Sequence, residues 1–229
     1  MSRPRFAVSR EDYIKTLWEL ARDGEKVIAA QLCRELEVSS AAVSKALQRL
    51  LRDRLVTMVS GGAIALTAAG NRLAERLVRR HRLVEKLLYE ALEFPWEQVH
   101  EEAERLEHAI SDRLEARLLA RFGEKSVCPH GYPVNPQAPA RPAGRPLSDF
   151  EEGQTGSVAR VYEKDPALLK LFAAMGMKPG AEVRILRKRA DETLEIRVGT
   201  RKFHIGFKAA RVIWISTASR TGRRTEAGT

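Results

Sequence analysis

Residues 29–56 read AAQLCRELEVSSAAVSKALQRLLRDRLV and predict a helix, a tight turn and a second helix. The apolar residues that would pack the two helices together recur at steps of three and four: Leu32, Leu36, Val38, Val43, Leu47 and Leu50. Two β-rich runs follow around Ser60-Gly61-Gly62 and predict a hairpin. This order of elements is typical of a winged helix-turn-helix, in which the second helix enters the DNA major groove.

The second helix leaves a small and polar face toward solvent. Side chains on this face can approach base edges and phosphates closely, so we predict that DNA is contacted by Ser39, Ser40, Ala41, Ser44, Lys45, Gln48, Arg49 and Arg52. For the arginines, simple solvation of a charged helix face is the alternative.

Composition limits the possible partners. The chain has 229 residues, a net charge of +10 and a pI near 9.9, which favours an anionic partner such as nucleic acid. We predict no membrane span and no signal peptide, because no apolar run reaches the roughly 18 residues a spanning helix needs. Two cysteines cannot make a disulfide framework, so a cytoplasmic protein is expected.

The pattern along the chain predicts an α+β fold. Further helices are expected from Ser9 to Arg22, from Thr67 to Leu92, and from Pro95 to Ile110; Ser111 and Gly123 bound a last helix. Ser9 and Asp12 resemble a capping box. We predict five segments: a DNA-binding domain at 1–70, a helical metal-binding and dimerisation domain at 71–135, a proline-rich linker at 136–146, a small SH3-like β-barrel at 147–215, and a disordered tail at 216–229.

The helix that begins at Pro95 contains a candidate metal site. Glu104, Glu107 and His108 stand at i, i+3 and i+4, so their side chains converge at the edge of an apolar stripe. Carboxylates held close together there would repel each other, and a divalent cation would relieve that repulsion.

A second candidate set comes from two neighbouring helices. His81 and Glu85 stand at i, i+4 on the preceding helix and can face His100 on the next. The alternative for each histidine is a structural pairing with a nearby glutamate. Oxygen ligands with imidazole suit Mn²⁺ or Fe²⁺, whereas structural zinc prefers thiolates, and we interpret Cys128 and His130 as structural.

Enzyme readings find little support. Glu97 and His100 match one half of the helical di-iron motif, but that architecture needs a second such pair, and no other histidine has Glu three residues earlier. Hydrolase, phosphate-loop and dinucleotide motifs are also absent. We therefore predict that the protein is not an enzyme, and a metal-storage or di-iron protein ranks third among the hypotheses.

Three segments resemble one known family. VRRHRLVEKLL (78–88), VHEEAERLEHAISD (99–112) and CPHGYPV (128–134), together with the order of elements, resemble the diphtheria toxin repressor family of metal-dependent regulators, including its manganese-responsive branch. The resemblance implies a homodimer in which metal binding positions two recognition helices on a palindromic operator. Residues 147–215 resemble the small β-barrel of the ferrous-iron transport protein A, here interpreted as a docking module.

The resemblance also implies ligands. The primary site would be Asp12, Glu104, Glu107 and His108, and the second site His81, Glu85 and His100, with Glu163 as a further candidate. A Met and a Cys replace Asp12 and Glu104 in iron-responsive members, so the oxygen pair here points toward manganese. Lys15 replaces an acidic ligand of the two-domain manganese regulators and casts doubt on their binuclear arrangement.

The leading hypothesis is a homodimeric repressor that binds operators of metal-homeostasis genes when Mn²⁺ or Fe²⁺ is bound, with no small-molecule substrate. The alternative is a winged-helix regulator that senses an organic ligand or an oxidant, with the Glu/His pairs structural.

Overall fold

The computed structural model describes residues 8–22, 24, 26–138 and 144–217. Its contacts divide the chain into two compact units, residues 1–92, 101–126 and 133–140 in the first, and 93–100, 127–132 and 141–229 in the second. Part of the predicted linker (139–143) and the predicted disordered tail from residue 218 onward lie outside the described residues. Within the described residues, no helix is both long and apolar enough to cross a bilayer.

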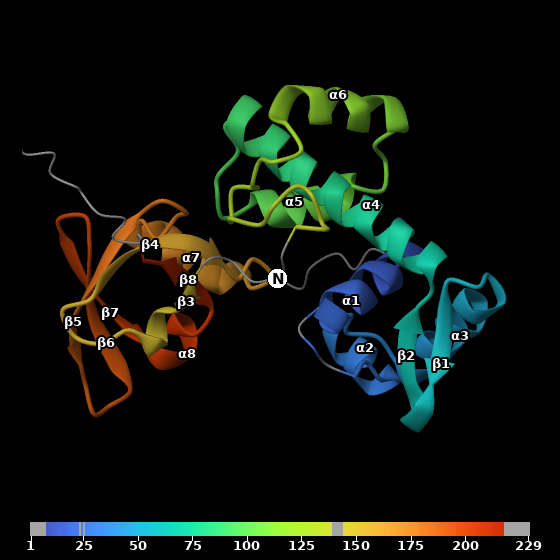
Figure 1. Ribbon diagram of the computed structural model, residues 1–229, viewed down its shortest axis with the longest axis horizontal. Helices are drawn as coiled ribbons and strands as arrows, with labels where there is room; N and C mark the ends of the chain where they lie inside the picture. Colours follow the sequence, from blue (N-terminus) through green and yellow to red (C-terminus); the bar gives the residue numbers. More distant parts are fainter. Residues whose placement is uncertain (1–7, 23, 25, 139–143, 218–229) are drawn as a thin grey trace, which may run out of the picture. The chain divides into compact units, whose positions relative to one another are not determined.

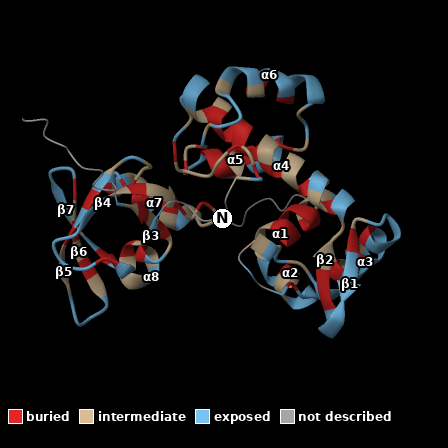
Figure 2. Cartoon of the chain, viewed as in Figure 1, coloured by how far each residue is buried: buried red, intermediate tan, exposed pale blue. Residues whose placement is uncertain are grey.

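The first unit begins with the predicted winged helix-turn-helix (Figure 1). Its elements are α1 (Arg10–Arg22), α2 (Ala29–Glu35), α3 (Ser40–Arg52), β1 (Val56–Val59), the 3-10 turn η1 (Ser60–Gly62) and β2 (Ala63–Leu66). The strands pair antiparallel, with Val56 opposite Leu66 and Val59 opposite Ala63. Figure 2 shows most of α1 as buried, and its Ile14 packs in one core with Leu32 and Val43.

Polar caps begin these helices where the sequence predicts. The backbone N–H of Ser9 donates to Asp12 Oδ2 at 2.6 Å, and the N–H of Asp12 donates to Ser9 Oγ at 3.2 Å. This reciprocal pair satisfies two donors that the first turn of α1 would otherwise leave without partners. Ser39 caps α3 and Thr67 caps the following helix in the same way.

Three more helical elements complete the first unit. They are α4 (Ala68–Lys86), which continues as the π-helical turn η2 (Leu87–Ala91), α5 (Val99–Leu106), and α6 (Asp112–Phe122), which Ser111 and Gly123 bound as predicted. Glu115 of α6 accepts hydrogen bonds from Arg76, Arg79 and Arg80 of α4. These ion pairs join α6 to α4.

The helix predicted from Pro95 to Ile110 is shorter in the structure, and this part of the prediction is wrong. The chain after Pro95 first makes a turn, in which Gln98 N–H donates to the Pro95 carbonyl, and α5 starts only at Val99. At its other end, Ala109 N–H donates to the Leu106 carbonyl three residues earlier, so the last turn tightens. Glu107 and His108 therefore follow α5 instead of lying within it.

The second unit is built on one antiparallel sheet in the order β3-β8-β4-β5-β6-β7. The strands are β3 (Arg145–Pro146), β4 (Thr155–Val161), β5 (Glu182–Lys188), β6 (Thr193–Val198), β7 (Arg201–Gly206) and β8 (Ile213–Ser216), with the turn η3 (Leu147–Asp149) and helices α7 (Pro166–Met175) and α8 (Phe207–Ala210). Leu194 and Ile196 alternate inward along β6, which is the period of a strand with one buried face. With helices and sheet in separate regions, the predicted α+β class is confirmed.

Gly70 permits a close approach between α4 and the end of the DNA-reading helices. A Cβ at this position would lie 2.0 Å from the Leu55 carbonyl oxygen, a backbone atom that also accepts from Thr67. We therefore expect Gly70→Ala to destabilise the protein by about 2 kcal/mol or more, because the backbone must shift. Denaturant unfolding followed by circular dichroism measures this.

Gly206→Ala is the matched control, because its Cβ would meet no heavy atom within 4 Å. Equal unfolding free energies for the two variants would contradict the close approach at Gly70.

Candidate metal centre and DNA-reading surface

Asp12, Glu107 and His108 form one cluster in the first unit. Their candidate ligand atoms lie within 4.8 Å of one another. His108 Nε2 is 3.0 Å from Asp12 Oδ1 and 3.6 Å from Glu107 Oε1. Asp12 therefore uses one carboxylate oxygen to cap α1 and the other to contact the imidazole. The cluster joins the first turn of α1 to the chain just after α5.

Glu11 is a member of this cluster that the sequence analysis missed. Its Oε2 lies 2.6 Å from His108 Nδ1, so the imidazole stands between two carboxylates from consecutive residues. Consecutive residues of a helix point about 100° apart, and only a partner placed between them can reach both. An acidic pair in a helix's first turn also has an ordinary explanation in the helix dipole, so the sequence alone offers no distinguishing signal for Glu11.

The carboxylates hold His108 in its charged form. Hydrogen bonds to Asp12 act against partial burial, and with Glu11 and the charge of Glu107 they raise the pKa of His108 to about 9. Burial alone would raise the pKa of Asp12, but its hydrogen bonds with His108 and Ser9 lower that pKa below its ordinary value. A doubly protonated imidazole thus bridges the two carboxylates at neutral pH.

Glu107 extends the cluster into a buried half. Its side chain is 1% exposed, and it accepts from Lys15 Nζ at 3.0 and 2.7 Å through its two oxygens. His81 Nδ1 lies 2.5 Å from Glu107 Oε2, and His81 Nε2 lies 3.2 Å from Glu85 Oε1. Burial would raise the pKa of Glu107, but the charges of Lys15 and His81 lower it below its ordinary value. Glu107 is therefore an anion between two cationic partners.

Glu104 is the one predicted primary ligand outside this close group. It is exposed in the structure, whereas Glu107 is buried. Its charge still acts on the cluster, because it helps to raise the pKa of Lys15 above its ordinary value against the effect of burial. The predicted convergence of Glu104 with Glu107 and His108 assumed a helix through Ile110, and α5 ends at Leu106.

The predicted second site draws on both units. His81 and Glu85 lie in the first unit, while His100 and Glu163 lie in the second. Within the second unit, His100 Nδ1 is 4.0 Å from Glu163 Oε1. A shared site that uses all of these residues stays a prediction.

Cys128 and His130 belong to a buried polar group in the second unit. His130 Nδ1 lies 3.3 Å from Glu163 Oε2, and the Cys128 thiol lies 3.9 Å from the same oxygen. The Trp96 ring packs against the His130 ring at 4.8 Å between centroids, and the Trp96 Nε1–H donates to the Pro129 carbonyl. A thiol, an imidazole and a carboxylate thus meet where the sequence analysis assigned Cys128 and His130 only a structural role.

The donor chemistry of the primary cluster fits a divalent metal of intermediate hardness. Carboxylate oxygens from Asp12 and Glu107 and an imidazole nitrogen from His108 are the donor types that suit Mn²⁺ and Fe²⁺. Four-coordinate structural zinc would favour thiolates, and neither cysteine is in this cluster. The close grouping of these atoms is the observation on which the fit rests.

The predicted DNA-reading residues share one exposed face. Each of the following side chains is exposed, while Val43, Leu47 and Leu50 are buried beneath them: Ser39, Ser40, Ala41, Ser44, Lys45, Gln48, Arg49 and Arg52. Ser39 also caps α3, since its Oγ accepts from the Ala42 N–H at 3.2 Å. The face combines small residues with cations, as close approach to a phosphate backbone requires.

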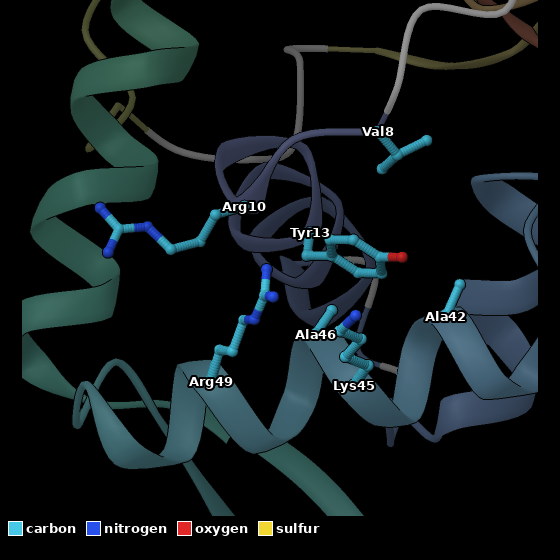
Figure 3. Close-up of a pocket in the computed structure, with 7 residues that line it drawn as sticks. All are labelled: Val8, Arg10, Tyr13, Ala42, Lys45, Ala46 and Arg49. Carbon is cyan, nitrogen blue, oxygen red and sulfur yellow. The ribbon is translucent and has the colours of Figure 1, made fainter.

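A hollow separates this face from α1 (Figure 3). It is lined by Val8, Arg10, Tyr13, Ala42, Lys45, Ala46 and Arg49. Figure 3 shows the Arg49 side chain pointing from α3 toward α1. Tyr13 follows the cluster residue Asp12 directly, so neighbouring residues of α1 serve the metal cluster and the recognition helix.

Family models match three parts of the chain. The iron dependent repressor N-terminal DNA binding domain matches residues 5–63, the iron dependent repressor metal binding and dimerisation domain matches 67–135, and the FeoA domain matches 145–217.

Individual relatives agree with these models. The diphtheria toxin repressor of Corynebacterium jeikeium is 30% identical over 199 residues, which is 76% of this chain and 82% of that protein. The iron-dependent repressor IdeR of Mycobacterium tuberculosis (strain ATCC 25618 / H37Rv) is 35% identical over 124 residues, 54% of each chain. A manganese-dependent transcriptional repressor in complex with manganese has a TM-score of 0.80 at 34% identity and covers 91% of this chain and 100% of its own.

Proposed function

Because the chain belongs to the diphtheria toxin repressor family of metal-dependent DNA-binding repressors, we propose that Mn²⁺ or Fe²⁺ held by Asp12, Glu107 and His108 controls its binding to DNA. The ion would supply positive charge that binds carboxylates and imidazole together. The resemblance that the sequence analysis drew to this family is confirmed.

The position of Asp12 is the observation that supports this control. Asp12 lies in the first turn of α1, which packs in one core with α3 residues such as Val43. Glu107 and His108 follow α5, outside the winged helix-turn-helix. A ligand shared by these segments would fix α1, and with it the exposed face of α3, relative to the rest of the first unit. DNA affinity would then depend on whether α1 is held in place.

The charge state of the cluster explains how the apo protein differs. Protonated His108 already bridges Glu11 and Asp12. When a metal binds, the imidazole must give up a proton and Asp12 must exchange its contact with His108 Nε2 for the ion. The apo arrangement is thus a weaker, proton-held version of the same connection between α1 and the chain after α5.

Several finer points remain proposals. The oxygen-rich donor set favours Mn²⁺ over the softer choices, and Glu104 would join as a ligand if its exposed side chain turns toward the cluster. We also propose a cytoplasmic homodimer that recognises a palindromic operator, has no catalytic activity and has no small-molecule substrate. The second site at His81, Glu85 and His100 and the domain limits at residues 70 and 135 are proposed on sequence grounds.

Operator binding with and without metal tests the proposed function. Duplexes selected from random sequence in the presence of Mn²⁺ should bind the full chain about 10- to 100-fold more tightly with Mn²⁺ than with excess chelator. Fluorescence anisotropy at constant ionic strength measures this, because phosphate contacts make affinity depend on salt. Equal affinity in the two conditions would remove metal control and favour a regulator that senses an organic ligand or an oxidant.

Lys45→Ala separates DNA reading from metal binding. Lys45 is exposed on α3 and has no part in the Asp12 cluster. The variant should lose about tenfold in operator affinity while its Mn²⁺ affinity, measured without DNA by isothermal titration calorimetry, stays unchanged.

A further inference from the structure

Lys15 lies within the metal cluster, although its side chain cannot be a metal ligand while it is charged. Its residue is 8% exposed, and its Nζ reaches both oxygens of Glu107 and lies 3.1 Å from His81 Nδ1. Asp12 stands three residues earlier on α1, one helical turn away on the same side. A buried ammonium therefore occupies the space between candidate ligand atoms of two different helical elements.

The cluster consists of an open half and a buried half that share Glu107. In the open half, His108 and Asp12 have side chains 27% and 30% exposed and lie beside Glu107 Oε1. In the buried half, His81 is 2% exposed and contacts Glu107 Oε2. An ion can enter the open half from solvent, whereas the buried half already contains a cation.

The donors are numerous enough for more than one ion. Besides the open half, Glu107, His81 and Glu85 supply two carboxylates and an imidazole in contact with one another. Such a set would bind a divalent ion if no other cation balanced it, because buried carboxylates need compensation. Lys15 gives that compensation through a covalent tether, so no dissolved ion has to be captured.

We propose that the Lys15 ammonium is a built-in cation that takes the place of a second metal ion, so that the cluster binds one divalent ion per chain. Lys15 also positions Glu107, because it fixes both carboxylate oxygens and leaves Oε1 beside His108. This proposal rests on the proposed function, since it names how many ions the same site accepts. It makes Lys15 a residue that determines the metal stoichiometry.

Removing the ammonium should open the second position. Lys15→Met keeps the length and apolar stem of the side chain and deletes its charge, while Lys15→Arg keeps a cation as the matched control. The full chain, stripped with chelator and dialysed against Mn²⁺, should bind one more ion per chain in the Lys15→Met variant than in the wild type or Lys15→Arg. Metal analysis after equilibrium dialysis gives the counts.

Electron paramagnetic resonance identifies where the additional ion binds. Two Mn²⁺ ions bridged by Glu107 should be magnetically coupled, whereas ions at distant sites give independent signals. The wild type should show only uncoupled Mn²⁺, and Lys15→Met should show coupling. A coupled pair in the wild type would overturn the proposal, and so would an unchanged count in a folded Lys15→Met protein.

The wild-type spectrum keeps the test decisive if the methionine variant does not fold, because one coupled pair there is sufficient to reject the idea. Failure of the proposed function has a different signature. In that case operator binding is independent of metal, whatever number of ions the cluster holds.

Discussion

His108→Ala should lower the affinity of the protein for Mn²⁺ by at least about 100-fold and remove the metal dependence of operator binding. Loss of a residue that merely supports a ligand can cost 10- to 100-fold, and His108 is the only imidazole among the three closely grouped donors of the open half. Calorimetric titration with Mn²⁺ and anisotropy with the selected duplex measure the two effects.

The substitution should leave the fold intact. The His108 side chain is 27% exposed, and both of its nitrogens face carboxylates that water can solvate after truncation. His204→Ala is the matched control, because His204 is exposed on β7 in the second unit. A full metal response in a folded His108→Ala protein would show that the primary site has been placed wrongly.

Glu107→Ala is a poorer test of the same site. It would leave the Lys15 ammonium buried without its principal anion, and breaking a buried pair on one side costs roughly 3–5 kcal/mol. A loss of metal binding in that variant could therefore reflect unfolding. The two neighbouring ligands differ in this respect because Glu107 connects the open and buried halves, whereas His108 belongs only to the open half.

The local elements of this protein could be predicted well from its sequence. Ser39 and Gly61 mark the start of the recognition helix and the tip of the hairpin, because capping and positive backbone φ depend on residue type within a few positions. The pairing of Ser9 with Asp12 is equally local and was also predicted.

The site could be predicted only in part, because its contacts join residues far apart in the chain. Glu11 and His108 are 97 positions apart, and Lys15 and Glu107 are 92 positions apart. Helical periodicity gives the side of α1 on which Glu11 and Lys15 lie, but not what packs there. The early end of α5 at Leu106 moved Glu104 out of the close group, since element boundaries depend on tertiary packing.

The pH dependence of metal binding should follow the proton on His108. Its pKa is raised from 6.5 to about 9, so in the metal-free protein the imidazole is charged at pH 7. Metal binding needs the neutral form, and below pH 9 each ion must displace one proton. The affinity for Mn²⁺ should therefore fall about tenfold for each pH unit between 9 and 7, which amounts to roughly 100-fold.

The stability of the metal-free protein should change in the opposite direction. Because the folded pKa of His108 lies above its unfolded value, the stabilisation from its carboxylate partners is fully present below about pH 6.5 and is lost as pH rises through about 9. Denaturant unfolding in chelator across this range measures the loss, and His108→Ala should not show it.

Proton release connects the two pH effects in one experiment. Calorimetric titrations with Mn²⁺ at pH 7.5, in buffers of different ionisation enthalpy, should report about one proton released per ion by the wild type. In the His108→Ala variant the weak remaining binding should release none from this source. Release near zero in the wild type would mean that His108 is already neutral before the metal arrives, and the protonated bridge between Glu11 and Asp12 could not then hold α1 in the apo protein.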